Sequence, residues 1–96
     1  MKEARVEDYF CRRVKETGGE VRKVQWIGRR GAPDRLAGWP NGRYAFVEIK
    51  SDTQGWALQE HQAREMARMR SCGLIIEPPI WNLQMVDGFI ERMTKA

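Results

Sequence analysis

Hydrophobic residues recur at two different spacings along the chain. Apolar side chains three or four positions apart, the spacing of one face of an α-helix, run through residues 3–16, 57–71 and 82–93. Alternating or continuous apolar runs, which favour β-strands, cover residues 21–26, 34–39, 43–51 and 74–77. The pattern therefore predicts elements in the order α-β-β-β-α-β-α.

Glycine and proline separate these elements. The glycine pair at residues 18–19 ends the first helix, because glycine tolerates the positive φ that commonly follows one. The Pro-Asn-Gly run at residues 40–42 predicts a hairpin turn, and a polar connection follows the third strand at residues 52–55. The proline pair at residues 78–79 stops the last strand. We expect an α/β fold with a mixed central β-sheet flanked by helices, forming one domain over residues 1–96.

Composition narrows the class of protein. Hydrophobic residues make up 42% of the chain, but no apolar run approaches the roughly 20 residues that span a bilayer. The first ten residues are charged throughout, which argues against a signal peptide. The two cysteines, Cys11 and Cys72, lie far apart and form no zinc-binding pair. A reduced, cytoplasmic setting without membrane contact is therefore expected.

The formal charge of +4 is unevenly distributed. Residues 1–50 carry twelve Lys or Arg against seven Asp or Glu, whereas residues 51–96 carry five against six. A basic half attracts phosphate groups, so nucleic acid is a candidate partner. The candidate contacts are basic residues close to the loop that follows the first strand, although a solvated charged surface explains the same residues. They are Lys23, Arg29, Arg30 and Arg35.

An acid and a base interrupt the most apolar strand, which reads YAFVEIK at residues 44–50. Glu48 and Lys50 are two positions apart, so their side chains project from the same face of the strand. Val47 and Ile49 point the other way, into a core. A weak ion pair near a strand end would account for Glu48 and Lys50 alone.

Asp34 makes a catalytic interpretation more favourable. The hairpin at residues 40–42 places Asp34 across from residues 48–50. Asp34 and Glu48 offer oxygen ligands suited to Mg²⁺ or Mn²⁺, and the backbone carbonyl of Ile49 could add a third. Such a metal can activate water, and Lys50 would orient that water and stabilise charge on the transition state.

The combination of Pro33-Asp34 with Glu48-Ile49-Lys50 resembles the signature of the PD-(D/E)xK nuclease superfamily. The string RGAPDRL at residues 30–36 is similar to the glycine-x-proline-aspartate segment of the VRR-NUC family, the virus-type replication and repair nucleases. The resemblance implies a restriction-endonuclease-like fold and Mg²⁺- or Mn²⁺-dependent endonuclease activity. It also implies a phage or bacterial origin, with the host cytoplasm as the setting if the protein is phage-encoded.

The resemblance implies two further catalytic residues. The family has a glutamate on the first helix, and Glu7 fits this position better than Glu3. It also has a glutamine on the helix after the ExK strand, which corresponds to Gln62, with Gln59 as the competing choice. Independently, Gln62 lies on one helical stripe with Leu58, Met66 and Met69, where an amide is costly unless it has hydrogen-bond partners.

The expected function is hydrolysis of DNA phosphodiesters, with selectivity for branched, flapped or four-way junction DNA and without a nucleotide cofactor. The catalytic set is then Glu7, Asp34, Glu48, Lys50 and Gln62. A homodimer is expected, because the resemblance implies it and because Trp39, Ile80 and Trp81 could form an exposed apolar patch. The alternatives are a non-catalytic DNA-binding module, a sequence-reading restriction endonuclease and an interaction subunit of a replication complex. The single histidine, His61, is expected to be solvated.

Overall fold

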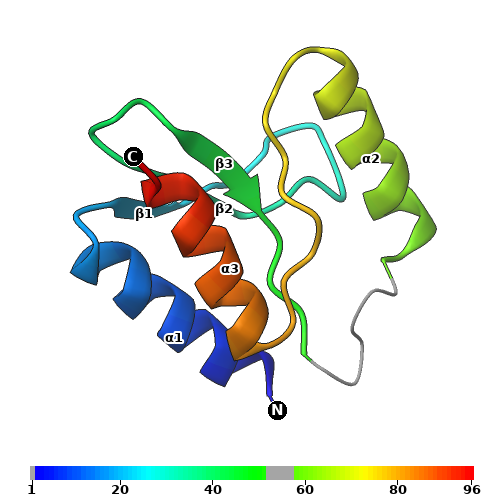
Figure 1. Ribbon diagram of the computed structural model, residues 1–96. Helices are drawn as coiled ribbons and strands as arrows, with labels where there is room; N and C mark the ends of the chain where they lie inside the picture. Colours follow the sequence, from blue (N-terminus) through cyan, green and yellow to red (C-terminus); the bar gives the residue numbers. More distant parts are fainter. Residues whose placement is uncertain (1, 52–57) are drawn as a thin grey trace.

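The computed structural model describes residues 2–51 and 58–96, and within these ranges the chain forms three helices and three strands (Figure 1). The helices are α1 (Glu3–Glu16), α2 (Glu60–Ser71) and α3 (Leu83–Thr94). The strands are β1 (Glu20–Lys23), β2 (Arg35–Gly38) and β3 (Tyr44–Val47). The connection predicted at residues 52–55 and the first residue of the helix predicted at 57–71 lie outside the described residues.

The three strands form an antiparallel sheet in the order β1-β2-β3. Its register pairs Lys23 with Arg35, and Arg35 with Val47. The predicted hairpin turn joins β2 to β3, and Gly42 adopts there a φ of 88°, which glycine accepts without strain. This hairpin brings the start of β2 beside the end of β3.

The strand predicted at residues 74–77 is replaced by two isolated parallel bridges to the β3 segment, Phe46 with Ile76 and Ile49 with Ile80. The backbone N–H of Glu77 donates to the carbonyl of Phe46 at 2.9 Å. Pro79 stands where a regular parallel ladder needs its next donor, and proline has no N–H. Ile80 supplies that donor instead, which interrupts the strand but keeps the segment alongside β3. The pairing is therefore mixed, as predicted.

Two helices cover one face of the sheet, and Figure 1 shows α1 and α3 lying side by side. Their apolar stripes pack against the alternate strand residues that point toward them. This main core is fully buried at most positions. It contains Val6, Phe10, Val14, Ala37, Trp39, Ala45, Val47, Ile49, Ile80, Val86, Phe89 and Ile90.

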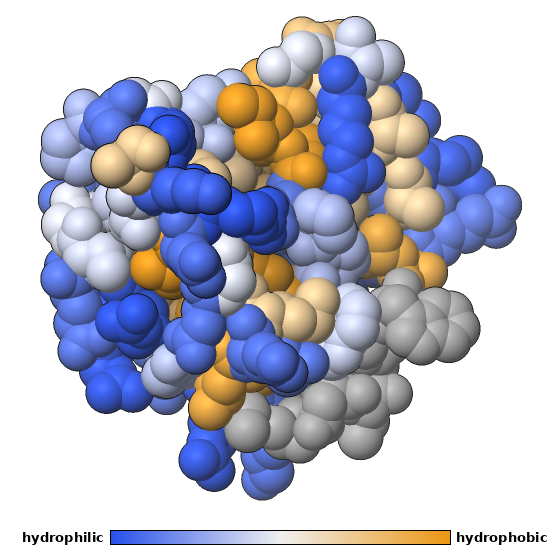
Figure 2. Space-filling view, viewed as in Figure 1, coloured by the Kyte–Doolittle hydropathy of each residue, from blue (hydrophilic) through white to orange (hydrophobic). Residues whose placement is uncertain are grey.

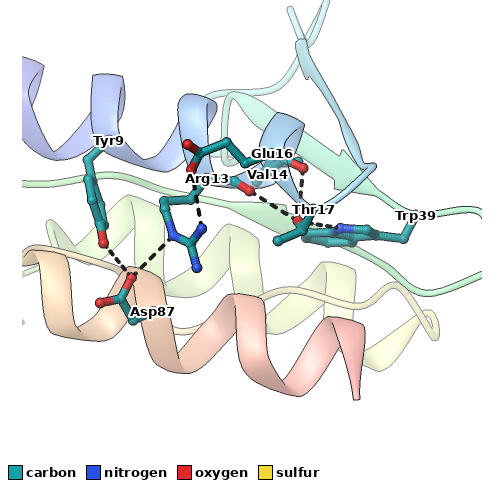
Figure 3. A network of polar contacts seen from close by, with 7 residues as sticks. All are labelled: Tyr9, Arg13, Val14, Glu16, Thr17, Trp39 and Asp87. Atoms are coloured by element: carbon teal, nitrogen blue, oxygen red, sulfur yellow. Dashed lines mark hydrogen bonds and ion pairs between the residues drawn. The ribbon is translucent and has the colours of Figure 1, made fainter. Parts of the chain in front are cut away.

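Polar contacts at the rim of this core tie α1 to α3 and to the sheet (Figure 3). The Tyr9 hydroxyl donates to Asp87 at 2.6 Å, and Arg13 lies 3.6 Å from the same carboxylate. The indole N–H of Trp39 donates to the Thr17 hydroxyl at 3.1 Å. These contacts fix the side of the sheet opposite to Glu48 and Lys50, which follow β3.

The apolar patch predicted from Trp39, Ile80 and Trp81 is wrong. Trp39 is only 7% exposed and Ile80 only 1%, because both pack into the main core, and Trp81 is half-buried. Among the described residues, the large hydrophobic side chains that are exposed are Ile27 and Ile75. Figure 2 shows hydrophobic surface where the segment after α2 runs beside β3, and Ile75 of that segment is 51% exposed.

Helix α2 packs through a second, smaller cluster. Met66, Met69 and Ile76 are buried there, with Trp26 and Phe46 packed against them. The Trp26 and Phe46 rings lie 5.3 Å apart. The second cluster holds α2 against the face of the sheet that Phe46 shares with Glu48 and Lys50, which follow β3.

None of the described helices is long and apolar enough to cross a membrane.

Candidate active site

The backbone of the Glu48-Ile49-Lys50 triplet is held on one side by a single residue. Ile80 donates its N–H to the Glu48 carbonyl at 3.0 Å and accepts from the Lys50 N–H at 2.9 Å. This pairing buries Ile49 in the core and directs Glu48 and Lys50 to the opposite face, as the alternation predicted. Because Ile80 uses that side of the segment, the Ile49 carbonyl points toward the side on which β2 lies.

Gln62 of α2 lies between Glu48 and Lys50. Its amide oxygen accepts from the Lys50 ammonium at 3.2 Å, and its amide nitrogen donates to Glu48 Oε2 at 3.4 Å. The Lys50 nitrogen is 3.6 Å from the same Glu48 oxygen. The side chains of Lys50 and Glu48 are only 13% and 15% exposed, so this triangle lies in a largely water-excluded place.

The helical stripe that singled out Gln62 is present in the structure. Met66 is fully buried and Leu58 packs against the same cluster, so the Gln62 amide projects from the inner face of α2. Gln59 is exposed and precedes the helix, where its backbone N–H donates to the Gln62 side chain at 3.1 Å. The amide therefore has the hydrogen-bond partners that its position in an apolar stripe requires.

Asp34 faces this triangle from the neighbouring strand. The β2–β3 register pairs Arg35 with Val47, so its continuation by one residue sets Asp34 opposite Glu48, on the same face of the sheet. The Asp34 carbonyl accepts from the Val24 N–H at 2.9 Å, which extends the β1–β2 pairing to this point. The Asp34 side chain remains 53% exposed, so solvent reaches the carboxylate.

The loop before Asp34 is fixed at both ends. The Trp26 indole donates to the Pro33 carbonyl at 2.7 Å. Gly31, with a φ of 90°, lies so close to α2 that a Cβ there would be 2.9 Å from the His61 carbonyl and 3.0 Å from the Gln62 Cα. A larger residue would push this loop away from the helix. His61 is half-buried against the loop, whereas the sequence predicted a solvated side chain.

The electrostatics of the site centre on Glu48. Burial raises the pKa of its carboxyl group above the usual value, the charge of Lys50 lowers it, and the negative charges of Asp34 and Glu3 raise it. Two acids thus act on Glu48 from α1 and from the start of β2. A concentration of carboxylate charge in a poorly hydrated place favours a cation or a proton there.

Glu7 and Arg35 are paired with each other beside Asp34. Glu7 forms an ion pair with Arg35, which in turn lies 3.3 Å from the Asp34 carboxylate, so Glu7 is linked to the site through Arg35. Glu3, the alternative acid, is the residue of this helix whose charge acts on Glu48. Arg35 is 8% exposed, and its guanidinium is engaged by two carboxylates. The prediction that Arg35 contacts DNA is therefore wrong, because the residue is buried between α1 and β2.

The other predicted DNA contacts are exposed. Lys23 ends β1, and Arg29 and Arg30 stand in the loop that leads to Asp34. Lys23 pairs with Arg35 across the strands, so it projects from the α1 side of the sheet. Arg29 and Arg30 are carried by the loop that Gly31 fixes against α2, close in sequence to Asp34. The side chains of Arg29 and Arg30 are therefore accessible to the phosphate groups of a nucleic-acid strand that crosses this loop.

The donor set fits a magnesium-type cation. Asp34 and Glu48 share a face, and the Ile49 carbonyl points to the same side of β3 as Asp34. Across residues 2–51 and 58–96, no group of three His, Cys, Asp or Glu side chains is close enough to hold a metal ion. Mg²⁺ needs no such group, because it commonly binds through one or two carboxylates and completes its shell with water and substrate phosphate.

Comparisons with known proteins agree with this geometry. No family model matches the chain. A protein named "Putative nuclease p44", from Acyrthosiphon pisum secondary endosymbiont phage 1, is 38% identical over 73 residues, which are 76% of each chain. A solved structure named VRR_NUC domain is similar with a TM-score of 0.82 and 37% identity, over 95% of this chain and 96% of that chain. The restriction-endonuclease-like fold is thereby confirmed, and the chain belongs to the VRR-NUC family of nucleases.

Proposed function

We propose that this nuclease is an endodeoxyribonuclease that hydrolyses phosphodiester bonds with the help of Mg²⁺ or Mn²⁺. The observation that carries the proposal is the buried Glu48–Gln62–Lys50 triangle, which faces Asp34 across the β2–β3 hairpin. A structural ion pair would explain Glu48 and Lys50, but it gives no reason for the Asp34 carboxylate and the Gln62 amide of α2 to face that same pair.

Each residue of the site has a distinct task. Asp34, Glu48 and the Ile49 carbonyl would hold the cation, which when bound supplies an activated water and offsets negative charge on the phosphate. The Lys50 ammonium donates to the attacking water or to the phosphate oxygen that gains charge. Gln62 positions Lys50 and Glu48 relative to each other, since its amide contacts both.

Contacts outside the triangle orient the substrate. Arg29 and Arg30 bind the phosphates next to the cleaved bond, and Lys23 extends the basic surface along β1. Glu7 acts indirectly by holding Arg35 against Asp34. The DNA contacts of this proposal are cations that bind phosphate groups, and phosphate contacts carry no base-sequence information. The shape of branched, flapped or four-way DNA is then the feature that such a site distinguishes.

The proposal predicts cleavage that requires a divalent cation and favours branched DNA. Flap, four-way and linear duplex substrates of equal length should be compared with Mg²⁺, with Mn²⁺ and with EDTA. We expect cleavage with either metal, none with EDTA, and a faster rate on branched DNA. Binding without cleavage under every metal condition would identify a DNA-binding module. Equal rates on linear and branched DNA would instead identify a general nuclease.

The Gln62 amide provides a more selective test. A Gln62→Ala protein should cleave about 10- to 100-fold more slowly, the usual effect of removing a partner that orients a primary group. Gln59→Ala tests the competing glutamine, which caps α2 and contacts Gln62 through both its side chain and its backbone N–H. Single-turnover cleavage rates of the two variants and of the wild type measure the effect. A normal rate for Gln62→Ala beside a slow Gln59→Ala protein would assign the role to the other glutamine.

A homodimer would place two such sites across two DNA strands. Ile80 and most of Trp39 are buried and cannot supply the main contact, but the sheet offers another surface. A groove of about 700 Å³ lies on the face away from α1 and α3, and Leu36, Tyr44 and Phe46 contribute apolar side chains to it. Arg22, Arg43 and Glu20 also line it, so both signs of charge are available for self-complementary pairing.

We expect Leu36→Glu to convert this dimer to a monomer, because a carboxylate in an apolar interface loses its hydration without gaining a partner. Ile27→Glu is the control, since Ile27 is 94% exposed and lies outside the groove. Sedimentation at micromolar concentration, with and without DNA, measures the change. A wild-type mass of 11.2 kDa without DNA, together with one protein chain per DNA in the complex, would exclude the dimer.

A further inference from the structure

A second cavity lies between α2 and the loop that follows β1. Its volume is about 450 Å³, within the range of about 300–1,000 Å³ that is usual for pockets that bind small organic groups. Trp26, Met69 and Leu74 give it an apolar wall. Arg29, Arg68 and Glu65 add charged groups.

Glu65 is the unusual member of this lining. It is 5% exposed, and it is one of the two charged residues that are buried among those the structure describes. Arg68 donates to its Oε1 through Nε at 3.0 Å and through a terminal nitrogen at 2.7 Å. Both of these bonds end on one oxygen, so Oε2 keeps acceptor capacity, and Glu65 lines the cavity. The Arg68 side chain is itself 54% exposed and therefore accessible to a ligand.

The cavity and the active site are built on the same two elements. Trp26, which lines the cavity, donates to the carbonyl of Pro33, the residue before Asp34. Glu65 follows Gln62 by three residues on α2, a rise of about 4.5 Å along the helix. The cavity is therefore close to the cleaved phosphodiester in the proposed function, on the side of the loop that carries Arg29.

We propose that this cavity receives an unpaired nucleobase next to the bond that is cleaved. The inference rests on the proposed function, because it places a DNA strand over the loop. The base stacks against Trp26, while Arg29 and Arg68 bind the flanking phosphates. Glu65 accepts a hydrogen bond from the exocyclic amino group of cytosine or adenine. Thymine lacks this group and is bound less well.

Equilibrium binding in EDTA tests the pocket without requiring cleavage. The probe is a set of flap DNAs in which one unpaired nucleotide beside the branch is cytosine, thymine or an abasic residue, placed in turn at each position next to the junction. At one position, we expect cytosine to bind about tenfold tighter than the abasic residue, as base stacking on an aromatic side chain provides. Thymine should lie between the two.

Variants separate the parts of the pocket. Glu65→Gln should reduce or reverse the preference for cytosine over thymine, because an amide also donates to the thymine carbonyl. Arg29→Ala should weaken binding of every probe. Arg64→Ala is the matched control, since Arg64 is a half-exposed cation of α2 that pairs with Glu60 and does not line the cavity. It should leave the preference unchanged.

The outcomes distinguish this inference from the proposed function. Equal affinity for cytosine, thymine and abasic probes at every position, with normal metal-dependent cleavage of the same DNAs, overturns the pocket and leaves the nuclease proposal intact. A base preference that Glu65→Gln removes, in a protein that cleaves none of these DNAs, supports the pocket and contradicts the proposed function. A preference that survives in Glu65→Gln also overturns the role given to this carboxylate.

Discussion

A Glu48→Gln protein is expected to lose DNA cleavage by a factor on the order of 10³ or more. The substitution keeps the size of the side chain and its hydrogen bonding near Gln62 and Lys50, but it removes the charge that would hold the cation. Asp34→Asn should have a comparable effect from the other side of the hairpin. Single-turnover cleavage of a flap DNA with Mg²⁺ and with Mn²⁺ measures both losses.

Two controls test whether the loss of cleavage comes from misfolding or from the loss of any one carboxylate charge. Glu60→Gln removes the same charge from α2 at a side chain that is 88% exposed, so it should cleave at the wild-type rate. Circular dichroism should show an intact fold for Glu48→Gln and Asp34→Asn. If either variant keeps metal-dependent cleavage near the wild-type rate, the corresponding residue does not belong to the active site.

The direction in which Glu48→Gln changes the stability of the protein follows from the pKa of Glu48. Burial raises the pKa of Glu48 in the folded protein, so between the unfolded and folded pKa values the folded state holds the proton more tightly. Stability from this group is therefore lost as the pH rises through that window. In metal-free buffer at neutral pH, Glu48→Gln should be at least as stable as the wild type. Its advantage should shrink in acid, as thermal unfolding can show.

The sequence predicted the elements that depend on local pattern. The alternation along residues 44–50 placed Glu48 and Lys50 on one face, and the turn at residues 40–42 set Asp34 opposite them. It also predicted a last strand that the structure replaces with two bridges. That strand needed a regular run of N–H donors, and the proline at position 79 removes one of them. The proline pair was visible in the sequence, but its effect depends on which edge of β3 the segment meets.

The site residues also divide into those that a local sequence pattern identifies and those whose position depends on long-range packing. Gln62 was identifiable because an amide in an apolar helical stripe needs partners, and the structure provides Glu48 and Lys50. Arg35 resembled the other arginines of the basic half. Its burial results from a partner, Glu7, that lies 28 residues earlier in the chain. A contact of this kind follows from the packing of α1 on the sheet, and no local pattern indicates it.

The location of exposed apolar surface also could not be predicted from a local sequence pattern. Trp39 follows β2 immediately and is covered because α3, more than 40 residues later, places Phe89 5.8 Å from its ring. Ile80 is buried because the segment after α2 returns to β3. Only the position of α3 and of the segment after α2 makes both residues unavailable for a dimer contact. The groove beside Leu36 became a candidate once the helices were placed on the opposite face.

Removing Lys50 should produce the second large effect. Lys50→Ala is expected to slow turnover by about 10²–10³-fold, because its ammonium is the cation of the site that can donate to the water or to the phosphate oxygen. The two carboxylates remain, so binding of Mn²⁺ by titration calorimetry should largely survive. Lys15→Ala, which removes an exposed lysine of α1, is the control and should cleave normally.

A pH profile separates this role from a structural one. The charge of Lys50 lowers the pKa of Glu48, so its removal lets burial and the charges of Asp34 and Glu3 raise that pKa further. If Glu48 must be ionised for cleavage, the rise in rate with pH should occur at higher pH in Lys50→Ala than in the wild type. That shift follows from the charge of Lys50 alone, so the rate at high pH, where Glu48 is ionised in both proteins, decides the role. A lysine that only tunes Glu48 would give the wild-type rate there, whereas a catalytic lysine leaves the plateau low in Lys50→Ala. A folded Lys50→Ala protein with the wild-type rate would remove Lys50 from the catalytic set.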